Sequence, residues 1–276
     1  MSMKNWTKVK FAFSEVNTIL GVVSAFLTVI CLIDFNKLFP KLSTRIYIVC
    51  GIFLIAFLIA GIKAIFTRNV EVNLGDGRSA VIECGDLFNC GDVVVIPVND
   101  SFDTIVNDTI IAKKSVHGQF VTRFFSNQLE ELDNQIERAL INIRPAGMYS
   151  EQKKGKKPYY PIGTTIVVRS GGKDYYLLAL THFKGDAVQP DLEGYYMAIL
   201  RLMEYLDAHV SGRQIYLPLI GSGLARLGRR KQQVLENLLC VLKMSRTTMV
   251  GKIHIVLHKN DLGKINLHNI CIANKV

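Results

Sequence analysis

From Val81 onward, short and nearly continuous apolar runs alternate with segments whose apolar residues recur every three or four positions. The first pattern is typical of a strand covered on both faces, and the second is typical of an amphipathic helix. Their alternation predicts one α/β domain with a mixed sheet between helices. The predicted strands are Val81–Cys84, Val93–Val98, Ile162–Arg169, Asp174–Thr181, Ile215–Ile220 and Lys252–His258, and the predicted helices are Phe120–Asn142, Leu192–His209 and Arg229–Ser245.

The stretch Gln214–Gly228, which reads QIYLPLIGSGLARLG, joins a predicted strand to a small-residue turn and a predicted helix. Backbone N–H groups at such a turn, next to the positive end of a helix dipole, bind phosphate oxygens. Glycine at positions 221 and 223 lets an oxyanion reach the backbone because glycine carries no side chain. The stretch therefore indicates a phosphate site, and an ordinary strand-to-helix turn without a ligand is the alternative.

The N-terminal part holds a second strong signal, two uncharged apolar runs at Val16–Ile33 and Ile46–Ile62. Each run is close to the length of a helix that crosses a bilayer, and the polar segment between them contains Pro40. A signal peptide and a buried core hairpin are the alternatives. The predicted organisation is a transmembrane helical hairpin, a linker and an α/β domain, which comprise residues 1–68 (spans about 12–33 and 46–66), 69–80 and 81–276.

The charge distribution indicates which kind of partner the chain contacts. The formal net charge is +10, and basic residues flank the apolar runs, which indicates a membrane surface rather than nucleic acid. The basic residues favour a cytoplasmic location for both ends of the hairpin. The six cysteines are scattered, with no CxxC pair, so they indicate reduced thiols and no metal site. The basic segment Ser150–Pro158 is interpreted as a solvated loop.

Six short segments in sequence order resemble the motifs of a macro domain. They are Gly85–Leu87, similar to Gly-Asp-Ile/Leu; Val93–Asp100, at the place of a strand ending in Asn-Ala-Ala-Asn; Ser115–Phe120, at the first phosphate loop; Pro161–Thr164, similar to the start of Pro-Thr-Gly-Glu-Ala; Tyr175–Phe183, similar to Tyr-Val-Ile-His-Thr-Val-Gly-Pro; and Pro218–Gly228, at the second phosphate loop. The resemblance covers roughly residues 70–262. It is closer still to the ThsA-type macro-like domain of Thoeris anti-phage effectors.

This resemblance implies binding of an ADP-ribose derivative where the strands end. Asp86, with the backbone N–H of Leu87 beside it, would accept a hydrogen bond from the adenine amino group, and a helix N-cap is its alternative role. Gly118–Phe120 and Gly221–Leu224 would wrap the two phosphates with backbone N–H donors.

The resemblance implies three further contacts with the ligand. Phe120 would pack on a ribose or base, or else in the core. Arg226 would neutralise the diphosphate, with a solvated charge as the alternative. Asn99 or Asp100 would contact the distal ribose. The implied ligand-binding residues are Asp86, Leu87, Asn99, Asp100, Ser115, His117, Gly118, Gln119, Phe120, Gly163, Thr164, Gly221, Ser222, Gly223, Leu224 and Arg226.

The sequence departs from hydrolytic macro domains in two places. Pro97–Asp100 replaces Asn-Ala-Ala-Asn, and Ser101–Gln119 contains one glycine, Gly118. His117 is a candidate base, but no acidic residue at a recognisable spacing accompanies it. We therefore expect a receptor with no catalytic residues, no metal and no cofactor. A membrane-anchored ADP-ribosyl hydrolase acting on ADP-ribose conjugates is the alternative.

The resemblance also implies a biological setting. In Thoeris-type systems a TIR-domain partner makes a modified ADP-ribose, and histidine–ADP-ribose is the expected signal for this class. The chain would be a multi-pass protein of the bacterial inner membrane, with its macro domain in the cytoplasm and no nucleic-acid partner. Ligand binding would drive homo-oligomerisation, and contact with membrane lipid would lead to membrane disruption and host cell death.

Overall fold

The computed structural model describes residues 16–21, 24, 41–66, 69–184, 187–188, 191–223, 230–245, 247, 251–261, 263–267 and 269–270. The chain divides into two compact units, one formed by Met1–Val70 with Asn266–Val276 and the other by Glu71–Ile265. The larger unit holds the central sheet, apart from the first residue of its first strand, Val70.

Helix α3 (Leu42–Phe66) contains the second of the two predicted membrane spans, and large apolar side chains such as Phe53 are exposed on it. Most of the first predicted span, about 12–33, lies outside the described residues, which include 16–21 and 24 in that part of the chain. Within the described residues, no helix combines the length and hydropathy that a membrane span requires. This finding contradicts the predicted location in the bacterial inner membrane. The predicted location is corrected accordingly.

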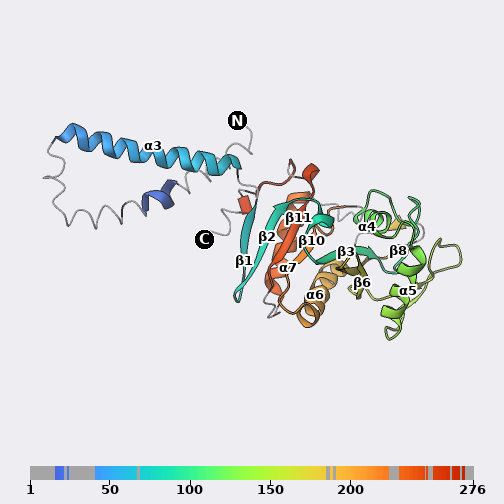
Figure 1. Ribbon diagram of the computed structural model, residues 1–276. Helices are drawn as coiled ribbons and strands as arrows, with labels where there is room; N and C mark the ends of the chain where they lie inside the picture. The colour runs from blue at the N-terminus through green and yellow to red at the C-terminus, as the bar shows by residue number, and fades with distance from the viewer. Residues whose placement is uncertain are drawn as a thin grey trace. The chain divides into compact units, whose positions relative to one another are not determined.

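A mixed sheet of seven strands forms the centre of the larger unit (Figure 1). The strands are β1 (Val70–Gly75), β2 (Arg78–Cys84), β3 (Val93–Asn99), β6 (Thr165–Ser170), β7 (Lys173–Thr181), β10 (Ile215–Pro218) and β11 (Ile253–Leu257). Their order is β1-β2-β11-β10-β3-β7-β6. Strands β2, β11, β10, β3 and β7 run parallel, and β6 pairs antiparallel with β7. The predicted mixed sheet of an α/β fold is confirmed.

Residues 69–80, predicted as a linker, contain β1 and the start of β2. In β1 buried and exposed residues alternate, with Val70, Val72 and Leu74 buried. Such a period of two is typical of a strand with one covered face. The alternate residues are polar or glycine, so the strand lacks a continuous apolar run such as the one that predicted Val93–Val98.

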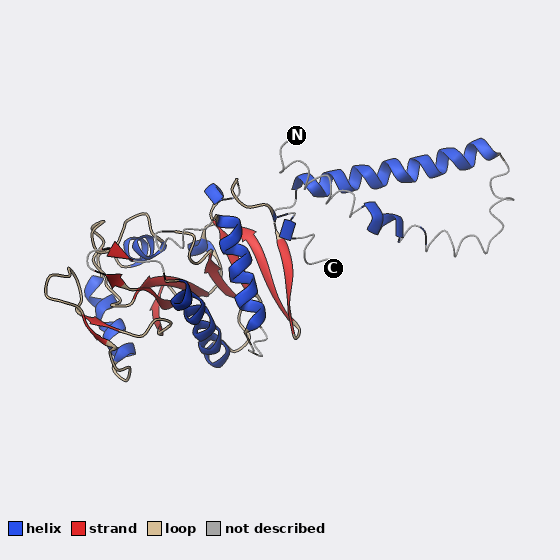
Figure 2. Cartoon of the chain, turned by 180° about the vertical axis from the view of Figure 1, so that it is seen from behind, coloured by secondary structure: helices blue, strands red, loops and turns tan. Residues whose placement is uncertain are grey.

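Helices cover both faces of the sheet (Figure 2). They are α4 (Val116–Phe124), α5 (Leu129–Leu140), α6 (Leu192–His209) and α7 (Lys231–Met244), with the short 3-10 helices η1 (Leu87–Asn89) and η2 (Lys259–Asp261). The Tyr175 ring of β7 lies 4.8 Å from the Phe120 ring of α4. The neighbouring Tyr176 ring lies 6.1 Å from the Tyr205 ring of α6. Because adjacent residues of a strand point to opposite faces, α4 and α6 lie on opposite sides of the sheet.

The predicted helix Phe120–Asn142 is two helices, α4 and α5, separated at Phe125–Gln128. Two small antiparallel pairs stand beside the main sheet: β4 (Gly147–Met148) with β5 (Pro158–Tyr159), and β8 (Phe183–Lys184) with β9 (Ala187–Val188). The basic segment lies between β4 and β5, so it is the connection of a short hairpin.

Candidate functional site

The parallel strands all end on one side of the sheet, called the carboxyl edge below. Asp86 follows β2, Asp100 follows β3 and Gly221 follows the end of β10. Three predicted ligand-binding segments that are distant in the sequence therefore lie along this edge. Open α/β sheets bind ligands at this edge.

Asp86 is the N-cap of η1, where its Oδ1 accepts a hydrogen bond from the Phe88 N–H at 3.2 Å. Its Oδ2 lies 2.7 Å from Nη1 of Arg123 on α4. Burial raises the pKa of the Asp86 carboxyl. The hydrogen bonds from Arg123 and the Phe88 N–H lower this pKa by more than burial raises it, so it lies below its ordinary value. The structure places Asp86 in its alternative role as a helix cap. The side chain of the adjacent Leu87 is buried.

The predicted first phosphate loop forms the N-terminus of α4. Ser115 caps this helix: its Oγ accepts a hydrogen bond from the Gly118 N–H at 2.9 Å and donates one to the Ala112 carbonyl at 2.7 Å. The Gln119 N–H donates to the Ser115 carbonyl at 3.0 Å. A Cβ on Gly118 would overlap the Ala112 carbonyl oxygen, so this close backbone approach requires glycine. The N–H groups of Gly118 and Gln119, predicted to hold a phosphate, are thus engaged in the helix cap.

His117 and Phe120 lie in the interior. Phe120 is fully buried, and its ring packs against Phe125 and Tyr175, which is its alternative role as a core aromatic residue. Burial lowers the pKa of His117 to about 3, although a hydrogen bond with the backbone of Asp103 raises it. The imidazole is therefore neutral at pH 7 and enclosed.

Asn99 ends β3 and is hydrogen-bonded within the turn that follows. Its Nδ2 donates to Asp103 Oδ2 at 3.1 Å, and its Oδ1 accepts from the Asp103 N–H at 3.1 Å. The register of β3 against β7 shifts between Val98 and Asn99. This shift lies next to Asn99 and Asp100. These are the two residues between which the macro-domain resemblance does not decide for the contact with the distal ribose.

Asp100 is the centre of a hydrogen-bonded cluster that the sequence analysis missed. Its carboxylate, 1% exposed, lies 2.6 Å from Nδ1 of His182, whose side chain is 48% exposed. The Tyr149 hydroxyl lies 2.9 and 3.0 Å from the two carboxylate oxygens, and it accepts a hydrogen bond from the Phe183 N–H at 2.8 Å. A carboxylate that orients one nitrogen of a partly exposed imidazole is an arrangement suited to proton transfer.

Electrostatics in this cluster follow from burial. Burial raises the pKa of the Asp100 carboxyl, and the hydrogen bonds from His182 and Tyr149 oppose that rise without cancelling it. Burial also raises the pKa of the Tyr149 hydroxyl, so this group is a protonated donor at neutral pH. Tyr149 and His182 are 49 and 82 positions from Asp100, and no local motif connects them. In the part of the chain that the structure describes, no His, Cys, Asp or Glu cluster is arranged to hold a metal ion.

The segment Ser150–Pro158 is anchored to the carboxyl edge. Lys153 Nζ lies 3.0 Å from Asp103 Oδ2, and both side chains are buried. The Lys156 N–H donates to Asp103 Oδ1 at 2.6 Å, and the Lys153 ammonium lies 4.8 Å from the centre of the Tyr149 ring. The prediction of a solvated loop is therefore wrong for Lys153, because the buried Asp103 carboxylate requires a compensating cation and N–H donors, whereas Glu151, Gln152 and Lys154 are exposed.

Gly163 packs against α6. Its φ of 90° is in the left-handed region, and a Cβ would lie 2.7 Å from Arg201 Cδ and 3.2 Å from Ala198 Cα. The Thr164 N–H donates to the Pro161 carbonyl at 3.0 Å. Packing and backbone conformation explain the glycine, and ligand contact by Gly163 and Thr164 stays a prediction.

The small-residue turn after β10 is present. Gly221 has a φ of 84°, and the Ser222 N–H donates to the Leu219 carbonyl at 3.2 Å. A Cβ on Gly223 would meet no described atom within 4 Å, and Gly223 is exposed whereas Gly221 is buried. Two predicted ligand-binding residues lie outside the described residues: Leu224 and Arg226.

Known proteins resemble this chain in both sequence and fold. Over 272 residues the chain is 28% identical to the Thoeris protein ThsA of Bacillus amyloliquefaciens (strain Y2), covering 95% of this chain and 88% of that protein. Two solved structures with 14% identity and a TM-score of 0.50 are a point mutant of the Oceanobacillus iheyensis macrodomain and the same macrodomain with ADP. The match to the point mutant covers 76% of this chain and 100% of that chain. The match to the macrodomain with ADP covers 75% of this chain and 98% of that chain. At this identity they show a shared fold.

The family model for the macro domain of the Thoeris protein ThsA matches residues 80–258. This range is more than half of the chain, and it includes the parallel strands β3, β7, β10 and β11. All of the segments along the carboxyl edge described above fall within it. The chain therefore belongs to the Thoeris ThsA macro-domain family.

Proposed function

We propose that this chain is a receptor of anti-phage defence that binds an ADP-ribose-derived nucleotide at the carboxyl edge. The observation that carries the proposal is the turn Gly221–Gly223, in which Gly223 is exposed, within the family match over residues 80–258. Strand β10 lies between β3 and β11, so the turn stands between the ends of two other strands. Backbone N–H groups of such a turn suit a diphosphate.

Two features support retention of the ligand rather than its cleavage. Asn99 is hydrogen-bonded to Asp103, so its amide is engaged by the turn rather than presented to a ligand. His117, the candidate base in the sequence, is buried, and its pKa is lowered to about 3. A receptor that does not hydrolyse its ligand keeps that ligand bound.

The cluster of Asp100 and His182 favours a second candidate function, hydrolysis of ADP-ribose conjugates. His182 Nδ1 is bonded to a buried carboxylate, which orients the ring as a proton acceptor for water. Incubating the protein with an ADP-ribose conjugate separates the two functions. Turnover that is lost in His182→Gln supports the hydrolase, whereas recovery of intact ligand at one equivalent supports the receptor.

The family setting supports further steps of the proposal. A TIR-domain protein would produce the nucleotide, with histidine–ADP-ribose as the expected form, and the receptor would oligomerise on binding it. A ligand drives assembly only when it binds the assembled state more tightly than the free one. Sedimentation with and without nucleotide tests this step, and an unchanged sedimentation coefficient at saturating ligand would contradict it.

Substitution in the turn after β10 tests the binding function directly. Gly223→Trp should abolish ADP-ribose binding measured by calorimetry, because the indole would occupy the space that a phosphate needs. Its cost in stability should be small, since a Cβ on Gly223 meets no described atom within 4 Å. Gly171→Trp is the control: Gly171 lies in the β6–β7 turn, away from the carboxyl edge, and also faces open space. Equal binding by both variants would refute the proposed location.

A further inference from the structure

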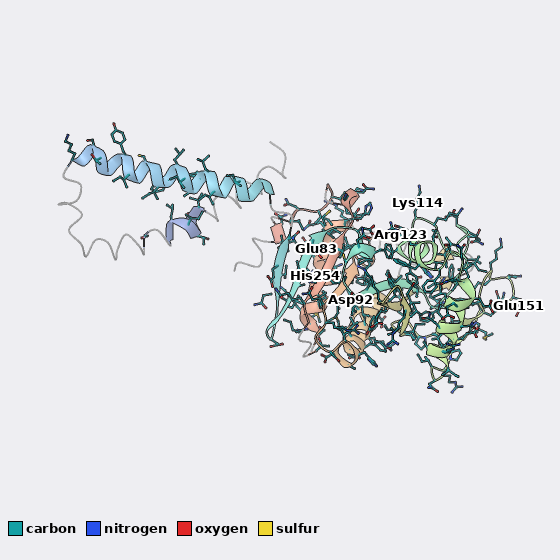
Figure 3. The ribbon with its side chains drawn as sticks, viewed as in Figure 1. Glu83, Asp92, Lys114, Arg123, Glu151 and His254 are labelled. Atoms are coloured by element: carbon teal, nitrogen blue, oxygen red, sulfur yellow. The ribbon has the colours of Figure 1, made fainter. Side chains whose placement is uncertain are left out.

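The hairpin of β4 and β5 stands outside the main sheet and contacts its carboxyl edge. This hairpin, residues 147–159, is called the strap below, and Figure 3 labels Glu151 on its connection. The connection, residues 150–157, contains no apolar residue other than glycine, so polar contacts attach it to the rest of the domain. Segments with few buried apolar contacts open locally at a lower free energy than the whole fold.

The strap is attached to the turn after β3 at two carboxylates, those of Asp100 and Asp103. The Tyr149 hydroxyl lies 2.9 and 3.0 Å from the two oxygens of Asp100. The Lys153 ammonium lies 3.0 Å from Asp103 Oδ2. Gly155 has a φ of 90°, and a Cβ there would overlap the Asp103 carboxylate. The strap is therefore shaped closely around this turn.

The closed strap keeps Asp100 from a ligand at the carboxyl edge. In the part of the chain that the structure describes, the Asp100 carboxylate is hydrogen-bonded by Tyr149 and His182, and its side chain is 1% exposed. Strand β10 lies between β11 and β3, and neighbouring strands are about 4.8 Å apart. ADP-ribose carries its diphosphate between two riboses, so with the diphosphate at the turn after β10 it extends over the ends of both neighbouring strands. At the end of β3 the Tyr149 hydroxyl already occupies the carboxylate.

We propose that the strap is an autoinhibitory element, which lifts from Asp100 when an ADP-ribose-derived nucleotide binds. The Tyr149 hydroxyl takes the place of a ligand hydroxyl at this carboxylate, so the strap and the ligand compete. The inference rests on the proposed receptor function. A ligand that binds only the open form has an apparent affinity reduced by the small fraction of molecules in that form. A substitution that weakens the closed strap therefore strengthens binding.

Tyr149→Phe tests this competition because it removes only the hydroxyl. The full chain is titrated with ADP-ribose and with inorganic pyrophosphate by calorimetry. We expect Tyr149→Phe to bind ADP-ribose about tenfold more tightly, since the closed form loses its hydrogen bonds to a charged carboxylate. Pyrophosphate, which has no ribose to reach the end of β3, should bind equally to both proteins. Tyr159→Phe is the matched control: it makes the same change in the same hairpin and leaves the Tyr149 hydroxyl in place.

Hydrogen exchange on the unsubstituted full chain gives a second readout. Two N–H groups join the strap to the rest of the domain: Lys156 donates to Asp103 Oδ1 at 2.6 Å, and Phe183 donates to the Tyr149 hydroxyl at 2.8 Å. Both are protected while the strap is closed. Saturating ADP-ribose should speed their exchange at least tenfold, whereas a ligand that binds the closed form would slow it. Saturating pyrophosphate should leave their exchange unchanged.

Several results would overturn the inference while leaving the receptor function intact. They are unchanged ADP-ribose affinity in Tyr149→Phe, an equal gain in Tyr159→Phe, and unchanged or slower exchange with saturating ADP-ribose. Weaker binding by Tyr149→Phe would overturn it in favour of a direct contact between the hydroxyl and the ligand. If neither the unsubstituted protein nor Tyr149→Phe binds ADP-ribose, the receptor function and the inference fail together. Thermal unfolding shows whether each variant retains the fold.

Discussion

Replacing Lys153 with alanine tests how firmly the basic segment Ser150–Pro158 is held. Lys153 Nζ lies 3.0 Å from Asp103 Oδ2. The Lys153 side chain is 6% exposed and the Asp103 side chain is 2% exposed. Removing one partner of a buried ion pair costs about 3–5 kcal/mol because the other charge stays buried. Asp103 would keep its hydrogen bonds from the Lys156 N–H at 2.6 Å and from Asn99 Nδ2 at 3.1 Å. We therefore expect a loss near the lower limit, about 3 kcal/mol.

The assay is urea unfolding of the full chain with linear extrapolation to water. Lys154→Ala is the matched control, because Lys154 lies in the same segment with the same charge and is exposed. Its free energy of unfolding should change by no more than about 0.5 kcal/mol. A double-mutant cycle with Asp103→Asn should show a coupling energy of at least about 1 kcal/mol between the two side chains. If Lys153→Ala and Lys154→Ala have the same free energy of unfolding, the segment is not anchored by this ion pair and the reasoning fails.

Four further substitutions have expected outcomes. Burial lowers the pKa of His117 to about 3, so the folded state binds fewer protons than the unfolded state between about pH 6.5 and pH 3. Stability should be complete above about pH 6.5 and fall by up to about 1.4 kcal/mol per pH unit below it, and urea unfolding of His117→Gln should show a weaker pH dependence. Gly163→Ala should cost about 2–3 kcal/mol, because its φ is 90° and a Cβ would lie 2.7 Å from Arg201 Cδ. Gly171→Ala, with a φ of 57° and open space around it, should cost about 1 kcal/mol in the same assay. Ser115→Ala removes the cap of α4 and should lower the melting temperature by an amount equivalent to about 1 kcal/mol.

Local patterns sufficed for most of the fold. The predicted helix Leu192–His209 has the bounds of α6, and the predicted strand Val93–Val98 lies within β3. Helical periodicity and apolar runs depend on residues a few positions apart, so they are readable before any tertiary contact is known. The same reasoning failed in two other places. Strand β1 lies in the predicted linker, and the predicted membrane location is contradicted because no described helix qualifies as a span.

The candidate site was only partly readable from the sequence. The small-residue turn at Gly221–Gly223 and the position of Asp86 after β2 follow from local motifs, and both lie at the carboxyl edge. The motifs did not show that the Asp86 carboxylate is paired with Arg123, 37 positions away. They also did not show that Phe120 faces the core rather than a ligand.

The chain's own patterns established an α/β domain with a phosphate-type turn, because apolar runs, helical periodicity and turn residues are visible among residues that are near neighbours in the sequence. The partners of Asp100, by contrast, are Tyr149 and His182, which are separated from it by 49 and 82 positions. Their meeting depends on the order in which parallel strands enter the sheet and on the path of the β4–β5 hairpin. No spacing rule encodes that path, so the hydrogen-bonded cluster was visible only after the strands were assembled.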